Sequence, residues 1–166
     1  IDTNLKTYGQ QIREQVLQWT GIPVSVGIAP TKALAKAANR IAKKFPSQTG
    51  NVHVIDSEQK RQKALKWLDI EDVWGIGRRS AKKLKDMGVE KAIDFAEMPE
   101  SRVLKFMTIT GVRLLKELNG ISAIDSDFTE KHKSISNTRT FEKNYTAFDE
   151  VKERVVTFAV LSAEKL

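Results

Sequence analysis

The sequence of 166 residues contains no cysteine. Disulfide bonds and thiolate metal sites are therefore excluded, and a cytoplasmic setting suits such a chain. Long apolar runs are also missing, because no stretch reaches the roughly eighteen residues that a membrane span needs. The two histidines, His53 and His132, are far apart and have no carboxylate pair beside them. We therefore expect neither a membrane span nor a metal site in this chain.

The two ends of the sequence lack the features of a complete protein. The chain begins at Ile1 rather than at a methionine, and it stops at Leu166 inside an apolar helical pattern. Both features predict a fragment of a longer protein.

Positive charge is what the sequence has in excess. The 28 Lys and Arg residues outnumber the 21 Asp and Glu residues, which gives a net charge of +7. Residues 1–50 hold seven basic and two acidic side chains, whereas residues 51–130 hold fourteen of each. A partner with many negative charges is therefore expected, and the first fifty residues are the most basic part of the chain.

The hydrophobic periodicity predicts an α+β fold. Over the first 55 residues it favours two helices alternating with two short strands, at 3–19, 24–28, 31–45 and 51–55. The next stretch is typical of short helices alone, near 57–67, 70–73, 78–87, 91–96, 100–107 and 110–118. The remainder predicts a linker over 121–133, a strand over 134–141 and a helix from 148 onward.

The predicted helix over 31–45 carries five basic side chains and no acidic one. Lys32, Lys36 and Arg40 follow each other at a spacing of four residues, at which like charges repel on a helix surface. An external anion would relieve that repulsion. A solvated face with no partner is the alternative interpretation.

The segment VWGIGRRSAKKLKDMG, residues 73–88, predicts a hairpin between two helices. Gly75 and Gly77 can expose bare backbone N–H groups, and the first N–H groups of the helix that begins at Arg78 have no partner inside the helix. Together these groups predict a cradle for one phosphate. Ile76 would anchor the hairpin in the core, and four basic side chains add charge beside the cradle: Arg78, Arg79, Lys82 and Lys83.

Two alternatives to these functional interpretations apply. The Gly-Ile-Gly bend is also compatible with an ordinary turn between helices. Trp19, Trp67 and Trp74 could stack on bases, but each occupies an apolar helical position or a hairpin boundary, so we expect all three to pack in the core.

With these stretches assembled, the chain resembles the Y-family of DNA polymerases. The resemblance covers nearly the whole chain, and Trp74 with the Arg78-Arg79 pair favours the UmuC branch, the bacterial SOS mutagenesis polymerase subunit. The stretches that carry it occur in the family's order: SVGIAPTKALAKAANRIAKK, TGNVHVID, DVWGIGRRSAKKLKDMG, NTRTF and the final SAEKL.

The resemblance implies a fragment that lacks the N-terminal palm and fingers. Residues 1–55 would be the closing part of a palm domain, and residues 56–120 would be an all-α thumb with a helix-hairpin-helix. Residues 121–133 would link the thumb to a little finger domain of α/β type, which begins over residues 134–166.

The resemblance also implies binding residues. Lys43 matches the position that contacts the triphosphate of the incoming dNTP, and Lys36 matches a second basic position of the same motif. Eight residues would meet the backbone of the template–primer duplex: the amides of Gly75, Ile76 and Gly77, the side chains of Arg78, Arg79 and Lys82 beside them, and Lys133 and Arg139 in the linker and little finger.

The implied activity is translesion DNA synthesis in DNA repair and the SOS response. Family members use Mg²⁺ ions held by palm carboxylates. These carboxylates would come from segments before Ile1, because Asp2 is better explained as a helix cap, so we expect no polymerisation by the fragment alone. UmuD-like and RecA-like proteins would be partners. The alternatives are a non-catalytic helix-hairpin-helix module for DNA repair and a domain that docks on an acidic protein.

Overall fold

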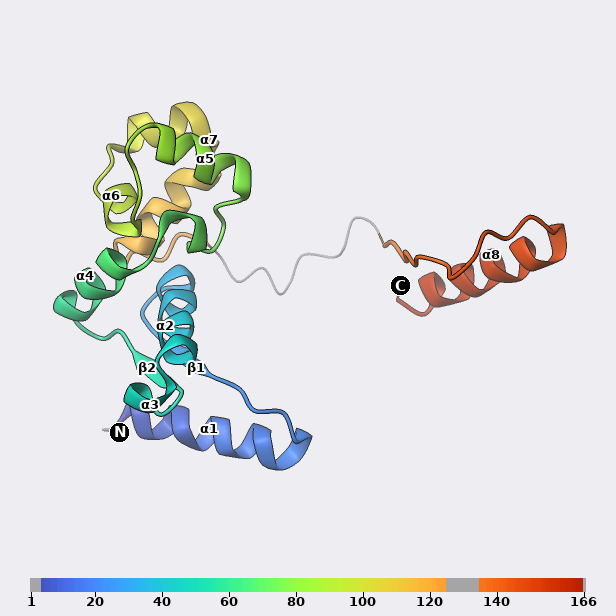
Figure 1. Cartoon of the computed structure of the whole chain (residues 1–166), viewed down its shortest axis with the longest axis horizontal. Coiled ribbons are helices and arrows are strands. Elements are labelled where there is room, and N and C mark those ends of the chain that lie inside the picture. Colours follow the sequence, from blue (N-terminus) through green and yellow to red (C-terminus); the bar gives the residue numbers. More distant parts are fainter. Residues whose placement is uncertain (1–3, 125–134, 166) are drawn as a thin grey trace. The chain divides into compact units, whose positions relative to one another are not determined.

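The computed structural model describes residues 4–124 and 135–165, which fall into two compact units that divide between Asp125 and Ser126. The first unit (Figure 1) contains, in chain order, α1 (Leu5–Thr20), β1 (Val26–Ile28), α2 (Lys32–Lys44), α3 (Pro46–Thr49), β2 (Val52–Val54), α4 (Glu58–Trp67), the 3₁₀ turn η1 (Ile70–Asp72), α5 (Arg78–Asp86), α6 (Ala92–Ala96) and α7 (Glu100–Leu118). The second unit contains α8 (Phe148–Ala163). The fold is therefore α+β, as the periodicity predicts.

The strands β1 and β2 pair in parallel and lie between two helices. A Cβ atom on Gly27 would lie 2.1 Å from the backbone nitrogen of Asn39 in α2, so only glycine permits this approach. A Cβ atom on Gly9 of α1 would lie 3.3 Å from the Ile28 side chain. Because successive strand residues point to opposite faces, α2 covers one face of the sheet and α1 covers the other.

Helix α2 begins and ends where the sequence predicts. The Thr31 hydroxyl caps it by accepting the Leu34 N–H at 3.4 Å. The helix ends at Lys44, and Pro46 then opens the short helix α3, which the sequence analysis did not predict. Proline suits the first position of a helix because its missing N–H would have no partner there.

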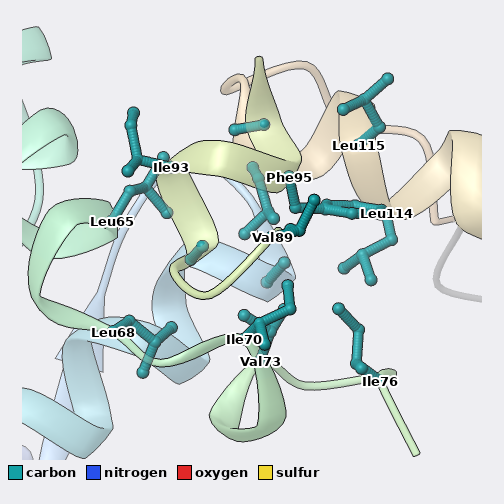
Figure 2. Packing of buried hydrophobic residues seen from close by; sticks show 14 of the residues in the cluster. Leu65, Leu68, Ile70, Val73, Ile76, Val89, Ile93, Phe95, Leu114 and Leu115 are labelled. Carbon is teal, nitrogen blue, oxygen red and sulfur yellow. The ribbon is translucent and has the colours of Figure 1, made fainter. Parts of the chain in front are cut away.

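The helices α4 to α7 share one hydrophobic core with α2. Phe95, Leu84 and Leu118 are completely buried in it, and Leu34 of α2 joins the same cluster with 1% of its surface exposed. Figure 2 shows side chains from η1, the hairpin, α6 and α7 converging on this cluster. The basic helix α2 and the Gly75–Gly77 hairpin are therefore anchored in a common core.

Helix α7 is interrupted where the sequence predicts a break between two helices. Thr108 has φ 59° and ψ −167°, values that no helical residue adopts. The predicted helices over 100–107 and 110–118 thus correspond to the two halves of α7.

The second unit differs from the sequence prediction in one element. Helix α8 begins at Phe148 as predicted, but the strand predicted over 134–141 is wrong for residues 135–141, which have no regular structure. A strand needs a neighbour for its backbone hydrogen bonds, and the described part of this unit contains no other strand. Within the described ranges of both units, no helix is long and apolar enough to cross a membrane.

Candidate nucleic-acid interface

Two apolar side chains anchor the hairpin between η1 and α5 in the hydrophobic core. Val73 and Ile76 have only 3% and 7% of their surfaces exposed, and Figure 2 shows both directed at the core. The Ile76 N–H donates to the Val73 carbonyl at 3.0 Å, which closes a tight turn. Gly75 lies inside that turn with φ +93°, a conformation that favours glycine.

The hydrogen bond from Ile76 to Val73 shows that one part of the predicted phosphate site is wrong. Because the Ile76 N–H already has an intramolecular acceptor, it is not free for a phosphate in this conformation. The buried Ile76 side chain instead has the anchoring position that the sequence analysis expects for it.

The amides on either side of Ile76 are open. In the part of the chain that the structure describes, neither the Gly75 N–H nor the Gly77 N–H has an acceptor. The first bond of α5 runs from the Ala81 N–H to the Gly77 carbonyl at 2.9 Å, so Arg78, Arg79 and Ser80 also present unbonded N–H groups. A run of free amides at a helix N-terminus attracts anions, because the helix dipole is positive there.

Neither the backbone conformation of Gly77 nor its packing against the described residues requires a glycine. Its φ is −79°, which any residue adopts, and a Cβ atom would meet no described atom within 4 Å. Gly77 is also the N-cap of α5, a position at which Ser, Thr, Asp or Asn would supply a capping oxygen and glycine supplies none. The missing side chain leaves the amides of α5 accessible from outside.

The basic residues of α5 surround these amides. Lys85 is bound by Glu71 at 2.6 Å, and this hydrogen bond raises the pKa of the Lys85 ammonium. Four others are exposed and form no ion pair with any described residue: Arg78, Arg79, Lys82 and Lys83. The helix therefore keeps four positive charges that no described carboxylate neutralises.

Trp74 lies at the outer side of the same hairpin. Its surface is 43% exposed, between Val73 and Gly75. The prediction that the tryptophans pack in the core is wrong for Trp74, and also for Trp19, which is 73% exposed. Only Trp67 is half-buried, with its ring 5.4 Å from that of Phe45.

The second basic helix, α2, is less free of counter-charges than its sequence suggests. The Arg40 guanidinium pairs with the Asp72 carboxylate of η1, which links α2 to the segment before the hairpin. The sequence analysis missed this pair because it considered helical neighbours only. Lys36, Lys43 and Lys44 are exposed and have no ion-pair partner among residues 4–124 and 135–165.

Lys43 and Lys44 line a groove between α2 and the helical residues that follow β2. The groove has a volume of about 630 Å³, and its other lining residues are Arg40, Trp67, Asp69, Asp72 and Lys91. Lys36 is not among them. The structure thus places Lys43 in a concave site of mixed charge and Lys36 on the surface outside it.

The N-terminus of α2 is closed by a buried carboxylate. Glu117 of α7 has no exposed surface, and its Oε2 accepts the Ala33 N–H at 3.1 Å. Its Oε1 accepts the N–H groups of Ala123 and Ile124 at 2.9 and 3.1 Å. Burial alone would raise the pKa of Glu117, but these amides and the Lys32 amide together lower it below its ordinary value.

Glu117 is a buried structural residue near the site that the sequence analysis did not find. A carboxylate between Leu114, Leu115 and Leu118 breaks the apolar pattern of α7, and this break was the available signal. The residue ties α2, the end of α7 and the segment that follows α7 to one another.

The remaining predicted residues belong elsewhere. Arg139 is exposed in the second unit. Lys133 lies outside the described residues, as do Asp2 and His132. In the described ranges, no three His, Asp or Glu side chains gather as metal ligands would, so the residues present do not fit the Mg²⁺ ions that the resemblance implies.

Two family models match the chain. The model of the impB/mucB/samB family matches residues 2–40, which include β1 and most of α2. The model described as the IMS family HHH motif matches residues 58–89, which include α4, the hairpin and α5.

Individual relatives match over almost the whole chain. Protein UmuC of Salmonella typhimurium is 35% identical over 98% of this chain, and Protein ImpB of the same organism is 36% identical over 96% of it. DNA polymerase IV of Oceanobacillus iheyensis is 27% identical over 87% of it. The chain spans 39%, 38% and 34% of the lengths of these three proteins.

Solved structures of DNA polymerases also match the fold of this chain. An insertion ternary complex of Dbh DNA polymerase superposes with a TM-score of 0.55 and 31% identity, over 72% of this chain and 33% of that one. A DinB family error-prone DNA polymerase from Sulfolobus solfataricus gives a TM-score of 0.56 and 29% identity, over 74% and 35% of the two chains. The chain therefore belongs to the Y-family of DNA polymerases, in the branch of UmuC, ImpB and MucB.

Proposed function

We propose that this chain is the duplex-holding part of a UmuC-like translesion DNA polymerase. Residues 1–55 are the closing part of its palm, residues 56–120 are its thumb, and residues 134–166 begin its little finger beyond a linker. The observation that carries the proposal is the open N-terminus of α5, where unbonded amides and unpaired cations meet beside Gly77. The match of the HHH motif to residues 58–89 supports it.

The hairpin would hold one phosphate of the template–primer duplex. The amides of Gly75 and Gly77 and the first amides of α5 are unbonded donors, and Arg78, Arg79 and Lys82 supply charge around them. Contacts to phosphates fix the register of a duplex but carry no sequence information. Such a grip suits a polymerase, which must hold any sequence that it copies.

The groove beside α2 would receive the triphosphate of the incoming dNTP. Lys43 lines it without an internal partner in the described chain, and Lys44 adds a second positive charge. The Arg40–Asp72 pair lines the same groove and joins α2 to η1. Lys36, which lies outside the groove, would meet the triphosphate only from the surface.

The chemistry of nucleotide transfer would depend on other parts of the whole protein. The Mg²⁺ ions would be held by palm carboxylates that this chain does not include. Lys133 and Arg139 would extend the backbone contacts along the duplex. The whole enzyme would act in the cytoplasm, with UmuD-like and RecA-like proteins as partners in the SOS response.

Duplex binding by the chain is the direct test. A fluorescently labelled 20-base-pair DNA duplex with a recessed 3′ end should bind at 50 mM salt, without sequence preference. If four phosphates are contacted, the affinity should fall about 100-fold at 200 mM salt, because each contact releases counterions. The absence of binding at 50 mM salt would refute the proposed function.

The triphosphate site is tested in the whole enzyme. Lys43→Ala should raise the apparent KM for dNTP about tenfold in primer extension, equivalent to the loss of one charged contact. Lys63→Ala is the matched control, since Lys63 is an exposed lysine on α4 that forms no ion pair with the described residues. Equal KM values for the two variants would remove Lys43 from the triphosphate site.

A further inference from the structure

We propose that Trp74 packs against a deoxyribose next to the phosphate held by the hairpin, and so distinguishes a nucleic-acid backbone from other chains of phosphates. The inference rests on the proposed function, because it assigns a second contact to the same bound strand. Trp74 would thus be a binding residue, and its contact would be with sugar rather than with a base.

The exposure of Trp74 is the first observation. Trp74 is 43% exposed although Val73 before it and Ile76 after it are anchored in the core. Those anchors and the tight turn between them prevent the indole from following its neighbours inward. A large apolar residue that stays partly exposed on an anchored hairpin offers a favourable contact surface for a ligand.

The identity of the neighbouring groups is the second observation. Trp74 directly precedes Gly75, whose N–H is open, and consecutive Cα atoms are only about 3.8 Å apart. In a nucleic acid each phosphate is joined to a sugar on either side. A phosphate bound at the Gly75 and Gly77 amides therefore brings a sugar within reach of the adjacent indole.

The chemistry of an indole suits this position. Its face is apolar and matches the C–H surface of a deoxyribose, and its N–H can donate to a second backbone oxygen. A sugar contact is independent of sequence, as the amide contacts are. An acidic protein partner would use the cations of α5 but would have no reason to need a sugar-sized apolar contact beside the amides.

The test compares a ligand that has sugars with one that has none. Trp74→Ala should weaken binding of the 20-base-pair DNA duplex about tenfold, but change binding of inorganic polyphosphate by less than twofold. Trp74→Phe should restore most of the duplex affinity. Trp19→Ala is the control, because Trp19 is an exposed tryptophan on α1, and it should leave both affinities within twofold.

A fluorescence measurement gives an independent readout. In a Trp19→Phe, Trp67→Phe double variant, Trp74 is the remaining tryptophan, since the sequence contains three. Its emission should shift and be quenched on addition of the duplex, and respond much less to polyphosphate at equal saturation.

The outcomes separate the two proposals. If the duplex binds but Trp74→Ala leaves its affinity within twofold and the emission is unchanged, the sugar contact is wrong and the proposed function stands. Equal losses for duplex and polyphosphate would also refute the sugar contact, because they would show a general effect on the hairpin. If the unaltered chain does not bind the duplex at all, both proposals fail.

Discussion

Helices α2 and α5 are both basic, but their N-termini are built in opposite ways. Helix α2 has a capping hydroxyl at Thr31, and its first amides meet the buried carboxylate of Glu117. Helix α5 starts at a glycine, has no side-chain cap, and presents amides without acceptors in the described chain. Both helix ends are positive, and only α2 has an anion of its own.

The difference indicates which end serves the fold and which serves a ligand. A helix end filled by a carboxylate from a distant segment joins those segments together, as Glu117 joins α7 to α2. A helix end left open, at the tip of an anchored hairpin, is available to an anion from outside. The predictions below test this division between a structural end and a binding end.

The largest effect is expected at the structural end. Glu117→Gln places an amide where the backbone donors need a carboxylate, and it should lower the free energy of unfolding by about 2–4 kcal/mol. Urea unfolding measures this loss. Glu97→Gln, at an exposed glutamate that pairs with no cation of the described ranges, should change the free energy of unfolding by less than about 0.5 kcal/mol. If the two variants have the same free energy of unfolding, the Glu117 carboxylate does not stabilise the fold.

The pH dependence of unfolding should identify the same group. The pKa of Glu117 is lower in the folded chain than its ordinary value of 4.5. Its contribution is therefore complete above pH 4.5 and is lost as the pH falls through the lowered pKa. Urea unfolding at pH 7 and pH 3 should show a smaller loss of stability on acidification in Glu117→Gln than in the unaltered chain.

At the binding end, Gly75→Ala should cost about 1–2 kcal/mol of stability, because its φ of +93° disfavours any Cβ. Gly21→Ala provides a control with φ +70° and open space around it, so it should cost a similar amount by thermal unfolding. The two variants should differ in duplex affinity, which only Gly75→Ala lowers. A similar duplex affinity in both variants would contradict the assigned site.

The charges of the two helices should contribute unequally to duplex binding by the chain. Arg79→Ala combined with Lys82→Ala should reduce the slope of log affinity against log salt by about 1.8, if each side chain neutralises one phosphate. Lys36→Ala on α2 should leave this slope unchanged. The slopes are measured by salt titration of the unaltered chain, the double variant and Lys36→Ala. Equal slopes in all three would show that the phosphates do not lie along α5.

The smallest effect is expected at the ion pair that joins α2 to η1, the turn before the hairpin. Arg40 and Asp72 are 49% and 30% exposed, so Asp72→Asn should cost no more than about 1 kcal/mol. A loss of duplex affinity above threefold in this variant, measured with the same labelled DNA, would show that the ion pair also positions the hairpin.

The sequence predicted the local features of the molecule well. The glycines around Ile76, the basic helix after them and the ends of α2 follow from backbone conformation and capping preferences, which neighbouring residues determine. Gly88, which follows α5, has φ +81°, the left-handed conformation that glycine often adopts after a helix. The two halves of α7 also match the two predicted helices, which meet at the non-helical residue Thr108.

Features that depend on distant contacts were not predictable in the same way. The Arg40 partner comes from η1 and the anion at α2 comes from α7, so no spacing within either helix reveals them. The exposure of Trp74 depends on how the hairpin leaves the core, which periodicity does not describe. The predicted strand after residue 134 failed because a strand depends on a neighbour rather than on its own pattern.

The difference between the two helix ends is tested most directly by giving α5 an anion of its own. Gly77→Asp is compatible with φ −79° and with the open space around the Cβ position. The new carboxylate should accept the free amides at the start of α5 and raise stability by about 0.5–1 kcal/mol.

The same carboxylate occupies the place of the phosphate and should weaken duplex binding at least tenfold, whereas Gly77→Ala, which adds only a methyl group, should weaken it less. Stability and duplex affinity measured together in Gly77→Asp should therefore move in opposite directions. A stabilised Gly77→Asp protein that binds the duplex as tightly as the unaltered chain would contradict the assignment of this helix end to phosphate.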